Sequence, residues 1–181
     1  MMTVADLLAP DRQWSGITRE PEMNPLVEPD AMREAQLLDV RLDALRSTAG
    51  LLFELRTALQ LRAANTGVLV ACGVRELSWS AGRRTTAKTA WTVDGWIPGS
   101  AGGRFVLEFG LWPTPGAFVR LESEGAAFFT GNVTGLDFIP DYGEDDEATV
   151  RANLANWGSE FHDVSAAFFA PNSPNNPQES T

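Results

Sequence analysis

The strongest constraint on the fold is the alternation of apolar and polar side chains in residues 51–61, LLFELRTALQL. Every second residue from Leu51 is apolar or threonine, whereas the residues between them include Glu54 and Arg56. A period of two is typical of a half-buried antiparallel strand. A helix has to be weighed because LRTALQLRAA contains good helix formers, but the regular alternation favours a strand.

The preceding segment, residues 37–45 (LLDVRLDAL), alternates in the same way. The loop RSTAG follows it and ends in Gly50, which tolerates backbone conformations that other residues avoid. The two segments therefore predict a β-hairpin. We expect Leu51, Phe53 and Leu55 to be buried in one sheet and to pair with the strand around Val40.

Strand-like runs continue along the chain, separated by Gly, Pro and Ser: GVLVACG, VRELSWS, TAKTAWTVDGW, RFVLEFGLW, AFVRLES, GAAFFTGNV and HDVSAAFFA. One helix is expected from about residue 144 to residue 156, because Val150, Leu154 and Trp157 recur at helical spacing and Gly158 follows. The predicted fold is mainly β. It is an antiparallel sandwich, a curved sheet or a barrel-like domain, with one C-terminal α-helix packed on it.

The length of 181 residues is that of one domain with tails. Residues 1–30 hold four prolines and little periodicity, so we expect an extended N-terminal arm there. Residues 31–170 are expected to form a single β-rich globular domain. Residues 171–181 hold no aliphatic or aromatic side chain and are expected to be a disordered C-terminal tail.

The chain has one cysteine, Cys72, so it forms no intrachain disulfide, and a disulfide-stapled secreted fold is excluded. No run approaches the roughly 18 to 20 apolar residues that span a bilayer. The first residues lack the basic region of a signal peptide. We therefore expect a soluble cytoplasmic protein. The sequence gives no indication of the oligomeric state.

Negative charge is concentrated at the end of the chain. The net charge is −10, and residues 134–181 contribute −8 of it, with nine acids and one base, Arg151. An acidic field attracts basic proteins and repels nucleic acid and anionic membranes. The same charge also has a simpler explanation, which is solubility.

The densest acidic segment is DYGEDDEATVRANLANW, residues 141–157. It fails the EF-hand pattern, because position 6 counted from Asp141 is Asp146 instead of glycine, and position 12 is Ala152 instead of glutamate. Three interpretations remain open, namely the charged first turn of a helix capped by Asp141 or Gly143, a patch for a basic partner, and a metal site. The candidate patch consists of Asp137, Asp141, Glu144, Asp145, Asp146 and Glu147.

Patterns for catalysis are weak, and we predict no catalytic residue, metal ligand or cofactor. His162 is the only histidine, and its neighbour Asp163 faces the other way if the segment is a strand. PGSAGG around Ser100 lacks the first glycine of a nucleophile elbow. SAGRRTTAKTAW lacks the spacing of a P-loop and is expected to be a hairpin tip that could pair with the acidic end of the chain.

Four tryptophans lie on or beside predicted strands, and they are either core residues or stacking platforms for sugars or bases. They are Trp79, Trp91, Trp96 and Trp112.

These observations predict a non-enzymatic binding protein whose acidic end engages a basic protein. One such binding protein would be an immunity protein that neutralises a toxin, and this analogy rests on composition only. The first alternative is a carbohydrate- or small-ligand-binding β module that uses tryptophans. The second is an enzyme with an unrecognised carboxylate site.

Overall fold

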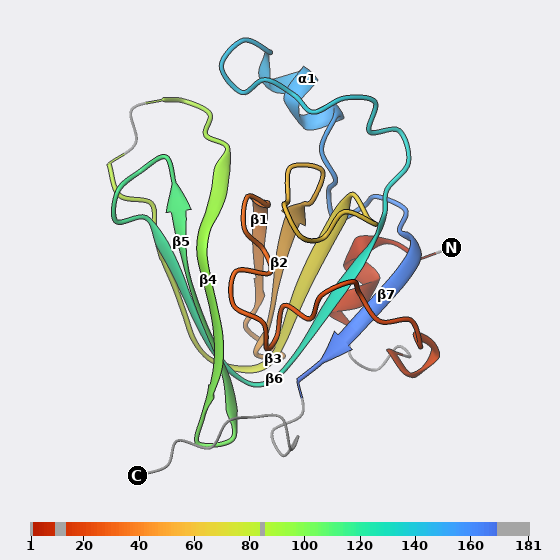
Figure 1. Ribbon diagram of the computed structural model, residues 1–181, viewed down its shortest axis with the longest axis vertical. Helices are drawn as coiled ribbons and strands as arrows, with labels where there is room; N and C mark the ends of the chain where they lie inside the picture. The colour runs from red at the N-terminus through yellow and green to blue at the C-terminus, as the bar shows by residue number, and fades with distance from the viewer. Residues whose placement is uncertain (1, 10–13, 84–85, 170–181) are drawn as a thin grey trace.

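The computed structural model describes residues 2–9, 14–83 and 86–169 (Figure 1). The expected tail, residues 171–181, lies outside the described residues. The strands are β1 Gln36–Asp43, β2 Thr48–Glu54, β3 Thr66–Ser80, β4 Trp91–Ala101, β5 Arg104–Trp112, β6 Phe118–Asn132 and β7 His162–Phe168. The helical elements are the 3-10 turns η1 Val4–Leu8 and η2 Trp14–Gly16 and the helix α1 Glu147–Ala152.

The strands form one curved antiparallel sheet in the order β3-β2-β1-β4-β5-β6-β7, and β3 also pairs with β6 (Figure 1). Six strands therefore close into a ring, and β7 continues the sheet beyond the second half of β6. The ring is tight along β3 and β6 and loose between β1 and β4, which share only two residue pairs. The predicted mainly β fold with one C-terminal helix is confirmed.

The predicted hairpin is confirmed, because Val40 of β1 pairs with Leu51 of β2. The prediction of a half-buried strand over residues 51–61 was wrong in two respects. The strand ends at Glu54, and all of its residues are buried. Both faces are covered because Leu51 and Phe53 point into the ring, whereas Leu52 faces a second apolar cluster outside it.

Two pairs of predicted strands are single long strands. β3 and β6 each run for 15 residues. β3 stays continuous through a bulge between Val74 and Glu76, next to Gly73, whose φ of +63° suits glycine. The predicted run at residues 86–96 is shifted along the chain, since β4 begins at Trp91 and continues past the run through Pro98 and Ser100 to Ala101.

The predicted helix over residues 144–156 is shorter than expected. α1 ends at Ala152 because Asn153 stops it: the Asn153 side chain donates to the Thr149 carbonyl at 3.0 Å, and its backbone N–H donates to the Thr149 and Val150 carbonyls. Trp157 therefore lies beyond the helix and packs in the outer cluster. Gly50 permits this packing, since a Cβ there would lie 2.9 Å from the Trp157 ring.

The inner core is built around aromatic side chains. Phe53 is fully buried, and its ring lies 5.8 Å from Trp96, 6.1 Å from Phe109 and 6.4 Å from Phe128. Cys72 lies in the outer cluster and is half-buried, and burial raises the pKa of its thiol. Within the described residues, no helix is long and apolar enough to cross a membrane.

Phe53→Ala should lower the free energy of unfolding by about 3–5 kcal/mol, because it leaves a cavity among three aromatic rings. Phe118→Ala is the matched control, since Phe118 is 45% exposed, and it should cost at most about 1 kcal/mol. Urea denaturation measures both. Equal losses in the two variants would show that Phe53 is not a central core residue.

Candidate functional site

The candidate site is the acidic loop, which we define as residues 136–147. It is anchored by an ion pair at the end of β2. Glu54 is fully buried, and Arg56 is 16% exposed. Arg56 Nε donates to Glu54 Oε1 at 2.8 Å, and Arg56 Nη2 donates to Glu54 Oε2 at 2.6 Å. This two-point geometry is the strongest that a guanidinium and a carboxylate can form.

The remaining donors of Arg56 hold the acidic loop. Nη1 donates to the carbonyls of Leu136 at 3.2 Å and Phe138 at 2.9 Å, and Nη2 donates to the carbonyl of Asn153 at 2.7 Å. One guanidinium therefore joins β2 to both the start of the loop and the end of α1. The loop backbone is therefore fixed at Leu136 and Phe138, where the exposed part of the loop begins.

The acidic residues divide into a turn and a helix cap, which corrects the prediction that Glu144 to Glu147 form one helical turn. The N-cap of α1 is Asp146, whose carboxylate accepts from the Thr149 N–H at 2.7 Å. That hydrogen bond lowers the pKa of Asp146. Asp141 instead accepts from the N–H groups of Gly143 and Glu144 at 2.7 and 3.1 Å.

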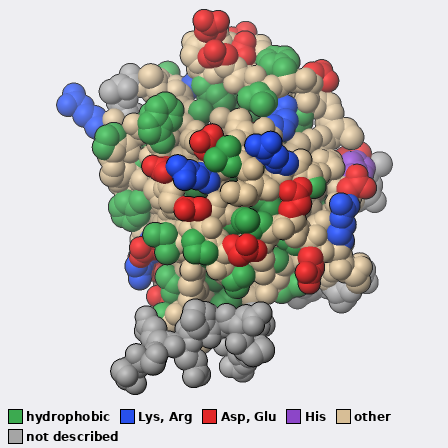
Figure 2. All heavy atoms as spheres, viewed as in Figure 1, with side chains coloured by type: hydrophobic (Ala, Val, Ile, Leu, Met, Phe, Trp, Pro, Cys, Tyr) green, Lys and Arg blue, Asp and Glu red, His purple; other side chains and the backbone are tan. Residues whose placement is uncertain are grey.

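The loop is exposed, and it combines charge with apolar surface. Of the six predicted patch residues only Asp145 is half-buried, and its carboxylate accepts from the Asp141 N–H at 2.8 Å. Phe138 and Ile139 are 47% and 46% exposed between Asp137 and Asp141. Figure 2 shows acidic side chains gathered at the top of the molecule, over the loop and α1, with hydrophobic side chains beside them.

Among the described residues, basic side chains compensate this charge only in part. Glu147 pairs with Arg151 at 2.7 Å on the exposed side of α1. The prediction of a hairpin tip around Lys88 was wrong, because the segment joins β3 and β4, which are not neighbours in the sheet. Lys88 nevertheless donates to the backbone carbonyl of Asp145, and its charge also helps to lower the pKa of Asp146. Arg104 lies elsewhere and pairs with Glu122 at 2.5 Å.

Tyr142 connects the loop to the buried pair electrostatically. Burial, and then the negative charge of Glu54, raise the pKa of Tyr142 from 10.0 to about 12, and the charge of Arg56 opposes this shift. The sequence does not indicate that Glu54, Arg56 and Tyr142 lie at one site, because their proximity depends on how the loop returns to β2. The apolar pair Phe138–Ile139 among acids was visible in the sequence.

The other predicted candidates are dispersed. His162 Nε2 lies 3.6 Å from a carboxylate oxygen of Glu160, and both side chains are more than 40% exposed. Among the described residues, no group of three or more His, Cys, Asp and Glu side chains is arranged to hold a metal ion.

The four tryptophans differ in their surroundings. Trp96 is fully buried, and its Nε1 donates to the Pro25 carbonyl at 2.7 Å, so it is a core residue. Trp79 and Trp91 form an edge-to-face pair 5.5 Å apart, with Trp79 44% exposed. Trp112 is 63% exposed. Core packing therefore explains Trp96 but does not explain Trp112.

Arg56→Met should lower the free energy of unfolding at pH 7 by about 3–5 kcal/mol, because it leaves the Glu54 charge buried without a partner. Arg75→Met is the control. Arg75 pairs with Glu124 at 2.5 Å, but both side chains are more than half exposed, so its loss should cost at most about 1 kcal/mol. If the two variants unfold at the same urea concentration, Arg56 does not anchor the loop.

Tyr142 is the only tyrosine, so the ultraviolet absorbance of phenolate reports on this residue alone. The titration midpoint should be about 12 in the folded protein and about 10 in urea. Because the folded pKa is the higher one, the stabilisation of the neutral phenol is complete below pH 10 and disappears as the pH rises through 12. Tyr142→Phe supplies the baseline, and a folded midpoint near 10 would place the ring in solvent.

Comparisons with known proteins identify no family. No family model matches the chain, and no curated protein matches it. A crystal structure of an uncharacterised protein from Neisseria gonorrhoeae is similar at a TM-score of 0.43 and 8% sequence identity, over 56% of this chain and 94% of that one. A similarity this low carries no argument about fold or function.

Proposed function

We propose that this chain is a non-enzymatic binding protein that engages a basic protein through the acidic loop. The observation that supports this most is the exposure of Phe138 and Ile139 among carboxylates on a loop that Arg56 fixes. Apolar side chains near the centre of a contact contribute most of the binding energy, and charges around them contribute mainly to the association rate and specificity.

Preorganisation also supports the proposal. A loop that must be ordered on binding costs free energy that weakens the complex. Here Arg56 already holds the carbonyls of Leu136 and Phe138. The carboxylates of Asp141 and Asp145 hold the next turn, because each accepts a hydrogen bond from a backbone N–H group. The side chains of Phe138 and Ile139 are therefore presented from a fixed backbone.

A soluble protein in the cytoplasm and a partner with a basic surface are parts of the same proposal. The single cysteine, Cys72, supports the cytoplasmic setting, and the acidic field favours a basic protein over nucleic acid and anionic membranes. An immunity protein for a basic toxin is one form of this proposal, and it rests on composition alone.

A second candidate function is binding of a carbohydrate or another small ligand by aromatic side chains. Trp112 is 63% exposed on β5, and Phe118 on the adjacent strand β6 is 45% exposed. Exposed aromatic rings on a sheet face can stack on sugar rings. Trp112→Ala should abolish such binding and leave capture of a basic protein unchanged.

Asp145→Asn combined with Asp146→Asn should slow association with the partner and leave dissociation nearly unchanged. Asparagine is as good an N-cap as aspartate, so α1 should persist. The partner is first captured from the native cell lysate with immobilised wild-type protein, at 0.01 M and at 0.15 M salt. Steering should fall with salt, as the Debye length falls from about 30 Å to about 8 Å.

The control variant combines Asp43→Asn with Glu124→Gln, which removes the same number of charges from exposed positions on β1 and β6. It should associate at the wild-type rate. The proposal fails if the captured partner is not basic, or if its association rate responds neither to salt nor to the loop variant.

A further inference from the structure

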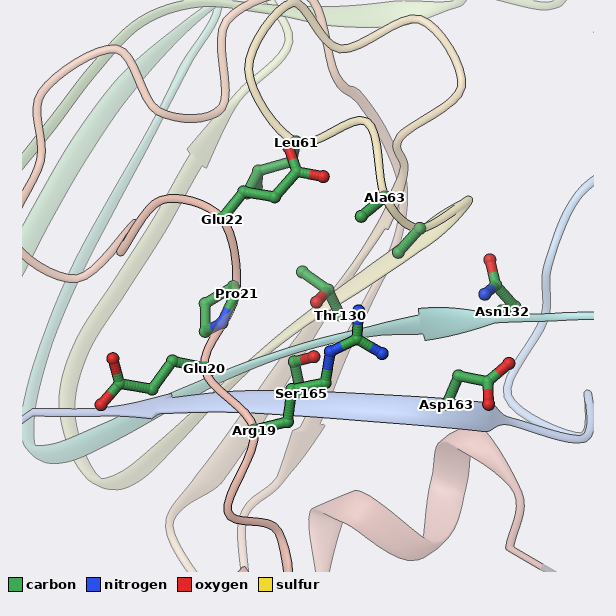
Figure 3. Close-up of a pocket in the computed structure, with 11 residues that line it drawn as sticks. Arg19, Glu20, Pro21, Glu22, Leu61, Ala63, Thr130, Asn132, Asp163 and Ser165 are labelled. Atoms are coloured by element: carbon green, nitrogen blue, oxygen red, sulfur yellow. The ribbon is translucent and has the colours of Figure 1, made fainter.

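A second feature, separate from the acidic loop, is a pocket of about 210 Å³ between the N-terminal arm, the loop after β2 and the strands β6 and β7 (Figure 3). Its floor consists of Thr130 and Asn132 on β6 and Asp163 and Ser165 on β7. The volume lies below the roughly 300 Å³ at which sites for drug-sized ligands begin, so the pocket suits a small molecule.

The floor of the pocket continues the sheet face that encloses the apolar core, but its side chains are polar. Phe128 pairs with Ala167, and both belong to the inner core, whereas Thr130 pairs with Ser165 two residues further along. Because side chains alternate between faces with a period of two, Thr130 and Ser165 lie on the same face as the core residues. The face that encloses the core therefore becomes polar where it reaches the pocket.

The two hydroxyls of the floor lie on largely buried residues and line the pocket. Thr130 is 6% exposed and Ser165 is 5% exposed, and neither side chain hydrogen-bonds to another described residue. Neither oxygen is among the fully buried side-chain atoms that lack a partner, so both oxygens reach the open space of the pocket. A ligand there can therefore hydrogen-bond to them without displacing a described protein partner.

Two opposite charges lie at different positions of the pocket. The backbone carbonyl of Arg19 accepts from the Ala166 N–H at 2.8 Å, which ties the arm to β7. From there the Arg19 side chain extends over the floor toward Thr130 (Figure 3). Asp163 lies near the other end of the floor, beside Asn132 (Figure 3). Within the described part of the chain, neither Arg19 nor Asp163 forms an ion pair.

The backbone at Asp163 is strained. Its φ is +53°, in the left-handed region that non-glycine residues rarely adopt, and it lies where the pairing of β6 and β7 shifts register between Thr130 and Asn132. Such strain concentrates at binding sites, where the surrounding structure holds a side chain in a required position. Here the shift places a carboxylate at the pocket in addition to the hydroxyl of Ser165.

The other polar groups of the lining narrow the choice of ligand. Glu20 points away from the pocket (Figure 3), and Glu22 accepts from the Arg62 N–H at 3.2 Å. Asn132 uses its side-chain oxygen to accept from the Asn65 N–H at 3.1 Å, which leaves its amide N–H₂ as a donor. The lining thus provides several donors around Arg19, and it carries negative charge at Asp163 on the floor and at Glu22 on the arm.

We propose that this pocket binds a small zwitterion of the α-amino acid class. The guanidinium of Arg19, whose planar donors match a carboxylate, takes the carboxylate of the ligand with help from the hydroxyls of Thr130 and Ser165. Asp163 takes the ammonium group. A simple anion such as phosphate is disfavoured by Asp163, and a neutral sugar leaves both charges uncompensated. This proposal does not depend on the proposed function of the acidic loop.

The test titrates the folded, ¹⁵N-labelled full chain with each of the common free α-amino acids and follows backbone amide shifts by NMR. At least one amino acid should bind with a Kd below about 10 mM. The shifts should centre on Thr130, Asn132 and Ser165. The N-acetyl derivative of that amino acid lacks the ammonium charge, and its amide lacks the carboxylate charge, so each should bind at least about tenfold more weakly.

Variants assign the roles of the residues. Arg19→Gln and Asp163→Asn should each weaken binding at least about tenfold, and asparagine tolerates the positive φ at residue 163. Ser165→Ala should weaken binding less, and Asp43→Asn, at an exposed position on β1 outside the pocket lining, should leave it unchanged. The proposal is overturned if no amino acid binds, if the shifts centre elsewhere, or if glucose or inorganic phosphate binds as well as the best amino acid.

Discussion

The buried pair of Glu54 and Arg56 is the interaction on which the C-terminal third of the structure depends. Burying a carboxylate without a partner is costly, and a guanidinium offsets that cost only when its geometry is good and its remaining donors are satisfied. Arg56 meets both conditions, because it binds Glu54 through two nitrogens and gives its other donors to backbone carbonyls of the loop and of Asn153. The carbonyls of the acidic loop therefore satisfy donors of the guanidinium that compensates the buried Glu54 carboxylate. The same hydrogen bonds hold the loop backbone, from which the exposed carboxylates project.

The long strands β3 and β6 explain why the molecule has two separate candidate sites. Because β6 pairs with β3 along its whole length, its other edge is free to take β5 on the first half and β7 on the second half. The first half closes the ring around Phe53 and Trp96, and the second half carries the polar floor of the pocket. After β6 the chain enters the acidic loop, and it returns as β7 beside the strand it left. One strand thus supplies both the pocket floor and the base of the loop.

The sequence predicted what depends on local periodicity. The hairpin around Val40 and Leu51 was recognised from the alternation in its two segments and the short loop between them. The strand β5 was recognised because its alternation matches one buried and one more exposed face. β2 was predicted as half-buried because its second face is covered by segments distant in sequence, including η1 and Trp157. The helix was overextended because periodicity cannot show that Asn153 caps it. The pocket was not predicted, because Arg19, Thr130 and Asp163 come from three parts of the chain that meet only after β7 pairs with β6.

The two candidate sites meet at Asn65, and this determines how they can be separated by mutation. Asn65 donates from its backbone to the side chain of Asn132 at 3.1 Å, and its side chain exchanges hydrogen bonds with both backbone groups of Val133, at 2.8 and 2.9 Å. Asn132 belongs to the pocket floor, and Val133 leads into the acidic loop. A change at Asn65 would therefore disturb both sites at once. Changes at the exposed Asp146 and the pocket-facing Arg19 leave this junction intact, so a loss of protein binding and a loss of amino-acid binding can be assigned to different surfaces.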